Sequence, residues 1–132
     1  PSIMANGTIA FDTLQTSGQI TGTAKSVDTD YVVTGSPRAW INYATQASFA
    51  TLASFNISSV SDQGAGSAHI TVTNAFSSAD YTYVVSCNTF HIQADAKDSN
   101  KTSSKFAAFS FNSSNSLNDA NETNAIAIGD LA

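Results

Sequence analysis

Short runs in which apolar and polar residues alternate, separated by turn-forming residues, are the feature that most constrains this chain. In the clearest example, two arms carry an apolar residue at every second position: Phe55 and Ile57 on the first arm, and Ala68, Ile70 and Val72 on the second. Alternation places such side chains on one face of a β-strand. Between the arms, DQGAG at 62–66 supplies glycines for the positive φ angles of a turn. The stretch predicts a β-hairpin.

The same alternation recurs after Pro37. We expect strands within 38–44, 80–90, 105–112 and 125–132. On the first of these, Ala39, Ile41 and Tyr43 share one face. On the second, the shared face carries Tyr81, Tyr83, Val85 and Cys87. The segment 44–55 allows a short helix, but its Ser and Thr content favours a strand or a bend. About seven strands with frequent turn signals predict an all-β fold, an antiparallel β-sandwich or jelly-roll.

The N-terminal part of the chain has fewer apolar residues. Between Gln19 and Ser36 only Val27 and the run from Tyr31 to Val33 offer side chains for packing, which predicts loop with one short strand. We therefore divide the chain into an extended segment, 1–36, for attachment or oligomerisation, and a β-sandwich domain, 37–132.

Composition limits the classes of partner. The chain has 132 residues, a formal net charge of −5 and only 11% charged residues. This charge repels phosphate backbones and anionic lipid, so we expect no nucleic acid and no membrane insertion. No apolar run is long enough to span a bilayer, and we expect a soluble chain without a classical export signal. Cys87 is the single cysteine. A small domain without disulfides depends on its core or on other subunits.

Catalytic and metal-binding patterns are weak. Cys87 and His91 share parity on one strand, but four strand residues span roughly 13 Å, too far for one zinc ion. His69 has outward parity and lacks a nucleophile motif. Asp28 and Asp30 allow a calcium site, although turn carboxylates explain them better. We expect no enzyme, no cofactor and no metal.

Two stretches carry a more specific signal. The first is PRAWINY, from Pro37 to Tyr43, and the second is SFNISSVSDQGAGSAHITVTNAFSSADYTYVVSC, from Ser54 to Cys87. Together they resemble a module near the C-terminus of many tailed-bacteriophage tail-fibre proteins, in which an A-W-V-N-F-like strand precedes an S-[FY]-N-[VI]-S-S-[VIL]-[TS]-D-x-G-x-G hairpin. The terminal AIAIGD also resembles the ends of such chains. His69 and Thr73 depart from the pattern, and Ala44–Ala47 replaces the family's Asn-Gly-Thr-Gly.

The resemblance implies a homotrimeric virion protein, made in the host cytoplasm, that joins other phage tail or virion proteins. It also implies that distal loops bind a host surface receptor, which we expect to be a glycan. The longest polar connections, 95–104 and 113–124, are the expected contact loops. The candidate contact residues are Asp95, Lys97, Asp98, Asn100, Lys101, Asn115 and Asn118.

Two other functions stay open. In a free carbohydrate-binding module, exposed aromatic rings such as Trp40 or Tyr43 would stack on sugars. Packing of Trp40 in the core or in a subunit interface is the alternative that we favour. A capsid decoration or head-fibre protein is the other open function.

Overall fold

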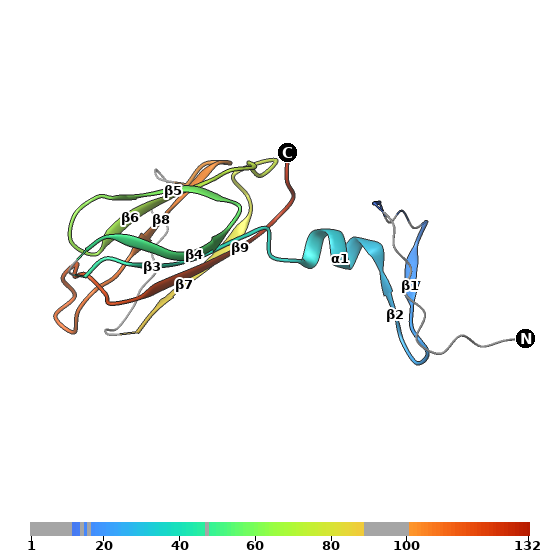
Figure 1. Cartoon of the computed structure of the whole chain (residues 1–132), viewed down its shortest axis with the longest axis horizontal. Helices are drawn as coiled ribbons and strands as arrows, with labels where there is room; N and C mark the ends of the chain where they lie inside the picture. Colours follow the sequence, from blue (N-terminus) through green and yellow to red (C-terminus); the bar gives the residue numbers. More distant parts are fainter. Residues whose placement is uncertain (1–11, 14, 16, 47, 89–100) are drawn as a thin grey trace, which may run out of the picture. The chain divides into compact units, whose positions relative to one another are not determined.

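The computed structural model of the chain describes residues 12–13, 15, 17–46, 48–88 and 101–132 (Figure 1). The chain divides into two compact units, Pro1–Val33 and Thr34–Ala132. The expected first strand, within 6–14, and the possible extension of the 80–90 strand past Asn88 fall largely or wholly outside the described residues.

The first unit contains a small antiparallel hairpin of β1 (Gln19–Thr21) and β2 (Ser26–Asp28). Helix α1 (Thr29–Gly35) follows directly. The expectation of loop with one short strand in this region is therefore wrong. A carboxylate oxygen of Asp28 accepts a hydrogen bond from the backbone N–H of Asp30 (3.1 Å), as an N-cap side chain does. No residue of α1 is buried, so its apolar side chains form no packed face. The cap at Asp28, and not a periodic apolar face, accounts for the start of the helix.

The second unit consists of two antiparallel sheets (Figure 1). The four-stranded sheet has the order β4-β3-β9-β7, and the three-stranded sheet has the order β5-β6-β8. The strands are β3 (Ala39–Ala44), β4 (Ala50–Phe55), β5 (Ile57–Asp62), β6 (Ser67–Val72), β7 (Thr82–Cys87), β8 (Lys105–Phe109) and β9 (Thr123–Ile128). The all-β, antiparallel prediction is confirmed, and the segment 44–55 contains a strand.

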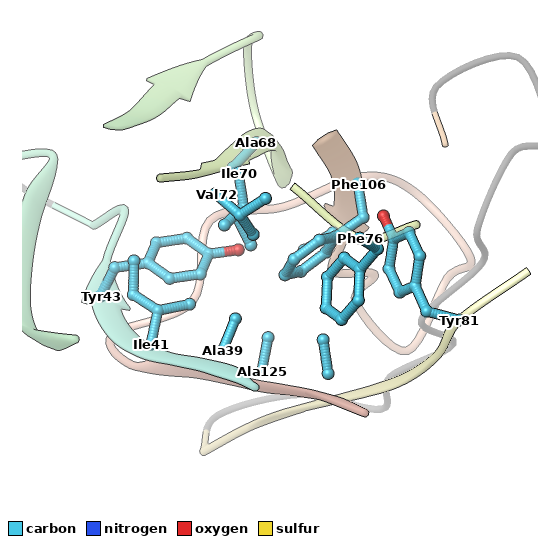
Figure 2. Close-up of a cluster of buried hydrophobic side chains, with 12 residues drawn as sticks. Ala39, Ile41, Tyr43, Ala68, Ile70, Val72, Phe76, Tyr81, Phe106 and Ala125 are labelled. Carbon is cyan, nitrogen blue, oxygen red and sulfur yellow. The ribbon is translucent and has the colours of Figure 1, made fainter. Parts of the chain in front are cut away.

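Alternation along the strands builds one core, to which both sheets contribute. Figure 2 shows its inward side chains, including Ile41 and Tyr43 from β3, Ile70 from β6 and Phe106 from β8. The rings of Phe76 and Tyr81 stack beside them with centroids 4.0 Å apart. The prediction that Ala39, Ile41 and Tyr43 share one face of β3 is confirmed, and the structure shows that this face is buried.

The predicted hairpin forms from β5 and β6, with positive φ at Gly64 (108°) and Gly66 (65°). Its first arm begins at Ile57, however, and not before. Phe55 pairs with Trp40 as the last residue of β4, in the other sheet. Asn56 lies between the two strands with φ 56°, so the chain changes sheets within one residue. The alternation of Phe55 and Ile57 therefore does not represent one strand.

Replacement of Phe106 by Ala should lower the free energy of unfolding by about 3–5 kcal/mol, because a fully buried ring leaves a cavity between the sheets. Chemical denaturation followed by circular dichroism measures this loss. Leu52→Ala is the control, since Leu52 is exposed on the edge strand β4 and should change stability by less than about 1 kcal/mol. Equal losses in the two variants would contradict the core described above.

Candidate functional site

The predicted contact residues are only partly placed. Asp95, Lys97, Asp98 and Asn100 lie outside the described residues. Lys101 is half-buried, and its ammonium group donates a hydrogen bond to the backbone carbonyl of Tyr81. The same group lies 4.6 Å from the centroid of the Tyr81 ring, within the range of a cation–π contact. Lys101 therefore already binds its own chain, and its role in host contact stays a prediction.

Asn115 and Asn118 belong to the connection between β8 and β9. Asn115 is exposed and has φ 61°, at the tip of a turn. The side-chain oxygen of Asn112 accepts hydrogen bonds from the backbone N–H groups of Ser114 (2.9 Å) and Ser116 (3.1 Å). Asn118 is half-buried, and its carbonyl accepts a hydrogen bond from the Ser110 hydroxyl (2.6 Å). The structure thus presents Asn115 to solvent and uses the backbone of Asn118 for support.

This connection packs against the turn of the β5–β6 hairpin. The backbone N–H of Gly66 donates to a carboxylate oxygen of Asp119 (2.7 Å), and the Ser110 N–H donates to the Gly66 carbonyl (2.8 Å). A Cβ atom on Gly66 would lie 2.5 Å from the backbone nitrogen of Asn118. Only glycine fits this position, and the contact fixes the base of the turn that carries Asn115.

No arrangement typical of catalysis stands out in the part of the chain that is described. No three His, Cys, Asp or Glu side chains there come together as metal ligands, and Cys87 is a half-buried free thiol. His69 is half-buried and is paired across the strands with Ser61 and Ala107. His91 lies outside the described residues. Among the described helices, none has the length and apolar character to cross a membrane.

Buried tyrosines serve the core. Burial raises the pKa of Tyr43 above its ordinary value, and burial also raises the pKa of Tyr81, with a smaller coulombic contribution from Tyr83. The Tyr81 hydroxyl donates to the Lys105 carbonyl (2.9 Å), and the Tyr83 hydroxyl donates to the Ala107 carbonyl (3.0 Å). These two hydrogen bonds connect Tyr81, the residue before β7, and Tyr83 of β7 to the backbone of β8 across the core. The tyrosine hydroxyls therefore have a structural role.

The outward face of the four-stranded sheet carries a row of exposed apolar side chains. Cross-strand pairing aligns Phe55 with Trp40, Trp40 with Ile126, and Ile126 with Val84, so the row crosses all four strands. The exposed fractions are 55% for Phe55, 40% for Trp40, 42% for Ile126 and 63% for Val84. We call these four residues the apolar row.

Trp40 and Tyr43 were both candidate sugar-stacking residues, and the structure separates them. Tyr43 is only 2% exposed, so its ring belongs to the core and cannot stack on a ligand in this structure. Trp40 is 40% exposed in the apolar row, so of the two packings that we favoured for it, the core of this chain is excluded. Packing of Trp40 in a subunit interface stays open.

Polar groups flank the apolar row. On one side, Asn42 pairs with Asn124 across β3 and β9, and the Asn42 amide donates to the Glu122 carboxylate (2.6 Å). On the other side, Arg38 precedes Trp40 by two residues and its backbone N–H binds the Ala127 carbonyl (2.9 Å). By strand alternation, Arg38 continues the outward side of β3.

Arg38 borders a pocket of about 410 Å³ at this end of the two sheets. The lining residues are Pro37, Arg38, Phe55, Asn56, Thr73, Asn74 and Leu131. The Nε atom of Arg38 is buried and has no hydrogen-bond partner among the described residues. The sequence reasoning missed this site. The shared parity of Arg38 and Trp40 was a usable signal, but only the structure adds Phe55, Asn74 and Leu131.

Comparisons with protein-family models, curated proteins and solved structures find no match for this chain. The resemblance to tail-fibre modules therefore depends on the motifs in the sequence alone.

Replacement of Gly66 by Ala should destabilise the hairpin and the β8–β9 connection together. The positive φ costs about 1–3 kcal/mol with a side chain, and the close contact with Asn118 adds about 1–3 kcal/mol. Gly64→Ala is the matched control, because Gly64 has a positive φ but open space around a Cβ atom. Denaturation midpoints of the two variants measure the difference. Losses of the same size would show that the crowding at Gly66 is unimportant.

Proposed function

We propose that this chain is a structural and host-binding module of a bacteriophage tail fibre, built as a β-sandwich that assembles into a homotrimer. The observation that carries the proposal is the apolar row on the outward face of the four-stranded sheet. The sequence motifs that resemble tail-fibre modules support the same assignment.

Single exposed apolar residues are normal on protein surfaces, but a contiguous row across a sheet is not. Phe55, Trp40, Ile126 and Val84 are neighbours in the register of four strands. None of the four is charged, and the nearest polar neighbours in the register, Asn42 and Asn124, are uncharged amides, with Glu122 beyond Asn42 and Arg38 on the other side of the row. Burying such a row against another copy removes apolar surface from water at a small cost in charge desolvation. A second copy of the chain is the occupant that we propose.

Host contact is assigned to the connection that carries Asn115. This turn is exposed, and its amide and hydroxyl side chains suit hydrogen bonding to sugar hydroxyl groups. Its base is held by Gly66 and Asp119, so the turn is preorganised for binding. Lys101 and Asn118 remain weaker candidates, since both already bind their own chain.

A carbohydrate-binding module is the second candidate, and one observation favours it. Trp40 and Phe55 are cross-strand partners with exposed rings, an arrangement that offers sugar rings an aromatic surface. A capsid decoration or head-fibre protein would use the apolar row in the same way as a tail fibre, so no observation favours it separately.

Light scattering across a dilution series tests the assembly. The wild-type chain should have a mass near three times 13.7 kDa. Ile126→Ser in the apolar row should weaken association about tenfold or more, because an apolar side chain is worth about 1.5–3 kcal/mol when buried. Leu52→Ser, on the same sheet but outside the row, is the control. A wild-type chain that stays monomeric at high concentration would contradict the trimer.

Trp40→Ala separates the two candidate functions. Trp40 is the only tryptophan in the chain, so its own fluorescence in the wild type also reports whether assembly covers it. In a fibre, Trp40→Ala should lower the mass of the assembly. Loss of binding on a glycan array with an unchanged mass would instead favour the carbohydrate-binding module.

A further inference from the structure

Arg38 is half-buried at the edge of the pocket, and one nitrogen of its guanidinium group has no partner among the described residues. Its Nε atom is buried without a hydrogen bond to the described part of the chain, and leaving a buried donor unpaired is costly. No carboxylate side chain lines the pocket beside it. The Nε atom itself has almost no surface that a ligand could contact, so a ligand in the pocket would pair with the terminal nitrogens, Nη1 and Nη2, of this half-buried residue. A carboxylate would bring the negative charge that the lining residues do not supply, and it matches the planar fork of a guanidinium.

The backbone around the pocket is held firmly by Asn56. Its side-chain amide donates to the carbonyls of Arg38 (2.9 Å) and Asn74 (3.2 Å), and its side-chain oxygen accepts from the Asn74 N–H (2.8 Å). Its own carbonyl accepts from the Thr73 N–H (3.0 Å). Residues from both sheets are thereby fixed before any ligand binds, which lowers the cost of ordering the site.

The remaining lining residues offer the two kinds of contact that a sugar needs. The side chains of Thr73 and Asn74 are exposed and make no hydrogen bond with the described residues, so both are available to hydroxyl groups. Phe55 and Leu131 are exposed apolar walls, suited to the C–H face of a sugar ring. The pocket volume of about 410 Å³ lies within the usual range for small-molecule sites.

The charge around the site selects the type of anion. Arg38 is the single charged residue among those that line the pocket, and the chain as a whole carries −5. One cation in a negative protein suits one carboxylate better than a phosphate dianion or a polyanion. We propose that this pocket binds a carboxylated sugar, a uronic or sialic acid, through Arg38. The inference goes beyond the proposed host contact at the Asn115 turn, because the pocket lies at the opposite end of the β5–β6 hairpin, and it rests on the proposed function only for the source of the sugar.

Titration calorimetry with two free sugars, glucuronic acid and N-acetylneuraminic acid, tests the site on the whole chain. At least one acid should bind, and glucose, which lacks the carboxylate, should bind about tenfold more weakly or not at all. Arg38→Gln should weaken binding of the acid about tenfold or more. Arg38→Lys, which keeps the charge and loses the fork, should give an intermediate affinity.

Lys25→Gln is the matched control, since it removes one positive charge from an exposed residue that does not line the pocket and should leave binding unchanged. Circular dichroism checks that each variant is folded. Binding of neither acid to the wild type would overturn the proposal, as would equal binding to folded Arg38→Gln. Tighter binding of inorganic phosphate than of either acid would overturn the choice of a carboxylate.

The two tests can be told apart although Phe55 belongs both to the apolar row and to the pocket lining. Arg38 lies outside the row, and the titration is repeated on Ile126→Ser, which weakens assembly without changing a lining residue, so that binding to the uncovered pocket is also measured. A trimer that binds no acidic sugar would remove this inference and leave the fibre assignment standing. A monomer that binds the acid through Arg38 would remove the fibre assignment and leave the pocket as a binding site for an acidic sugar.

Discussion

The hydrogen bonds of Asn56 join the two sheets of the second unit, and much of the remaining structure depends on them. The strand β4 ends at Phe55 and β5 begins at Ile57, so one residue with left-handed backbone carries the chain from one sheet to the other. Its side chain binds the backbone of Arg38 on one side and of Asn74 on the other. Asparagine suits this position because it tolerates positive φ and both donates and accepts hydrogen bonds. The crossover aligns the sheets over their common core and brings Arg38, Phe55 and Asn74 to one pocket.

The two faces of the four-stranded sheet have different uses. The inner face packs Ile41 and Tyr43 against the other sheet, a use that the alternation alone explains. The outer face carries large apolar side chains in the middle, with Arg38 toward one end and the Asn42–Glu122 pair toward the other. A face that served only solvation would carry charged side chains instead. The apolar middle of the outer face is the surface that we propose to be buried on assembly. The pocket at the Arg38 end of the same face is the site that we propose for the sugar.

Much of the fold could be predicted because its strands alternate clearly. The inward residues of β3, the hairpin turn at Gly64 and Gly66, and the strand β8 all follow from period-two patterns and turn residues. The errors arose where local pattern and tertiary context differ. Phe55 and Ile57 alternate as one strand would, yet Asn56 separates them into two sheets. Helix α1 exposes its apolar residues, so no periodic face indicated it.

The sequence by itself determined the all-β class, the glycine positions of the turn and which residues of β3 share a face. These are properties of a few neighbouring residues, set by side-chain alternation and by allowed φ angles. Only the tertiary structure decided the cross-strand register, which aligns Trp40 with Ile126 and Val84. It alone also placed Leu131 and Asn74 beside Arg38. Register and strand order depend on contacts between residues far apart in the chain, and no local pattern encodes which strands become neighbours.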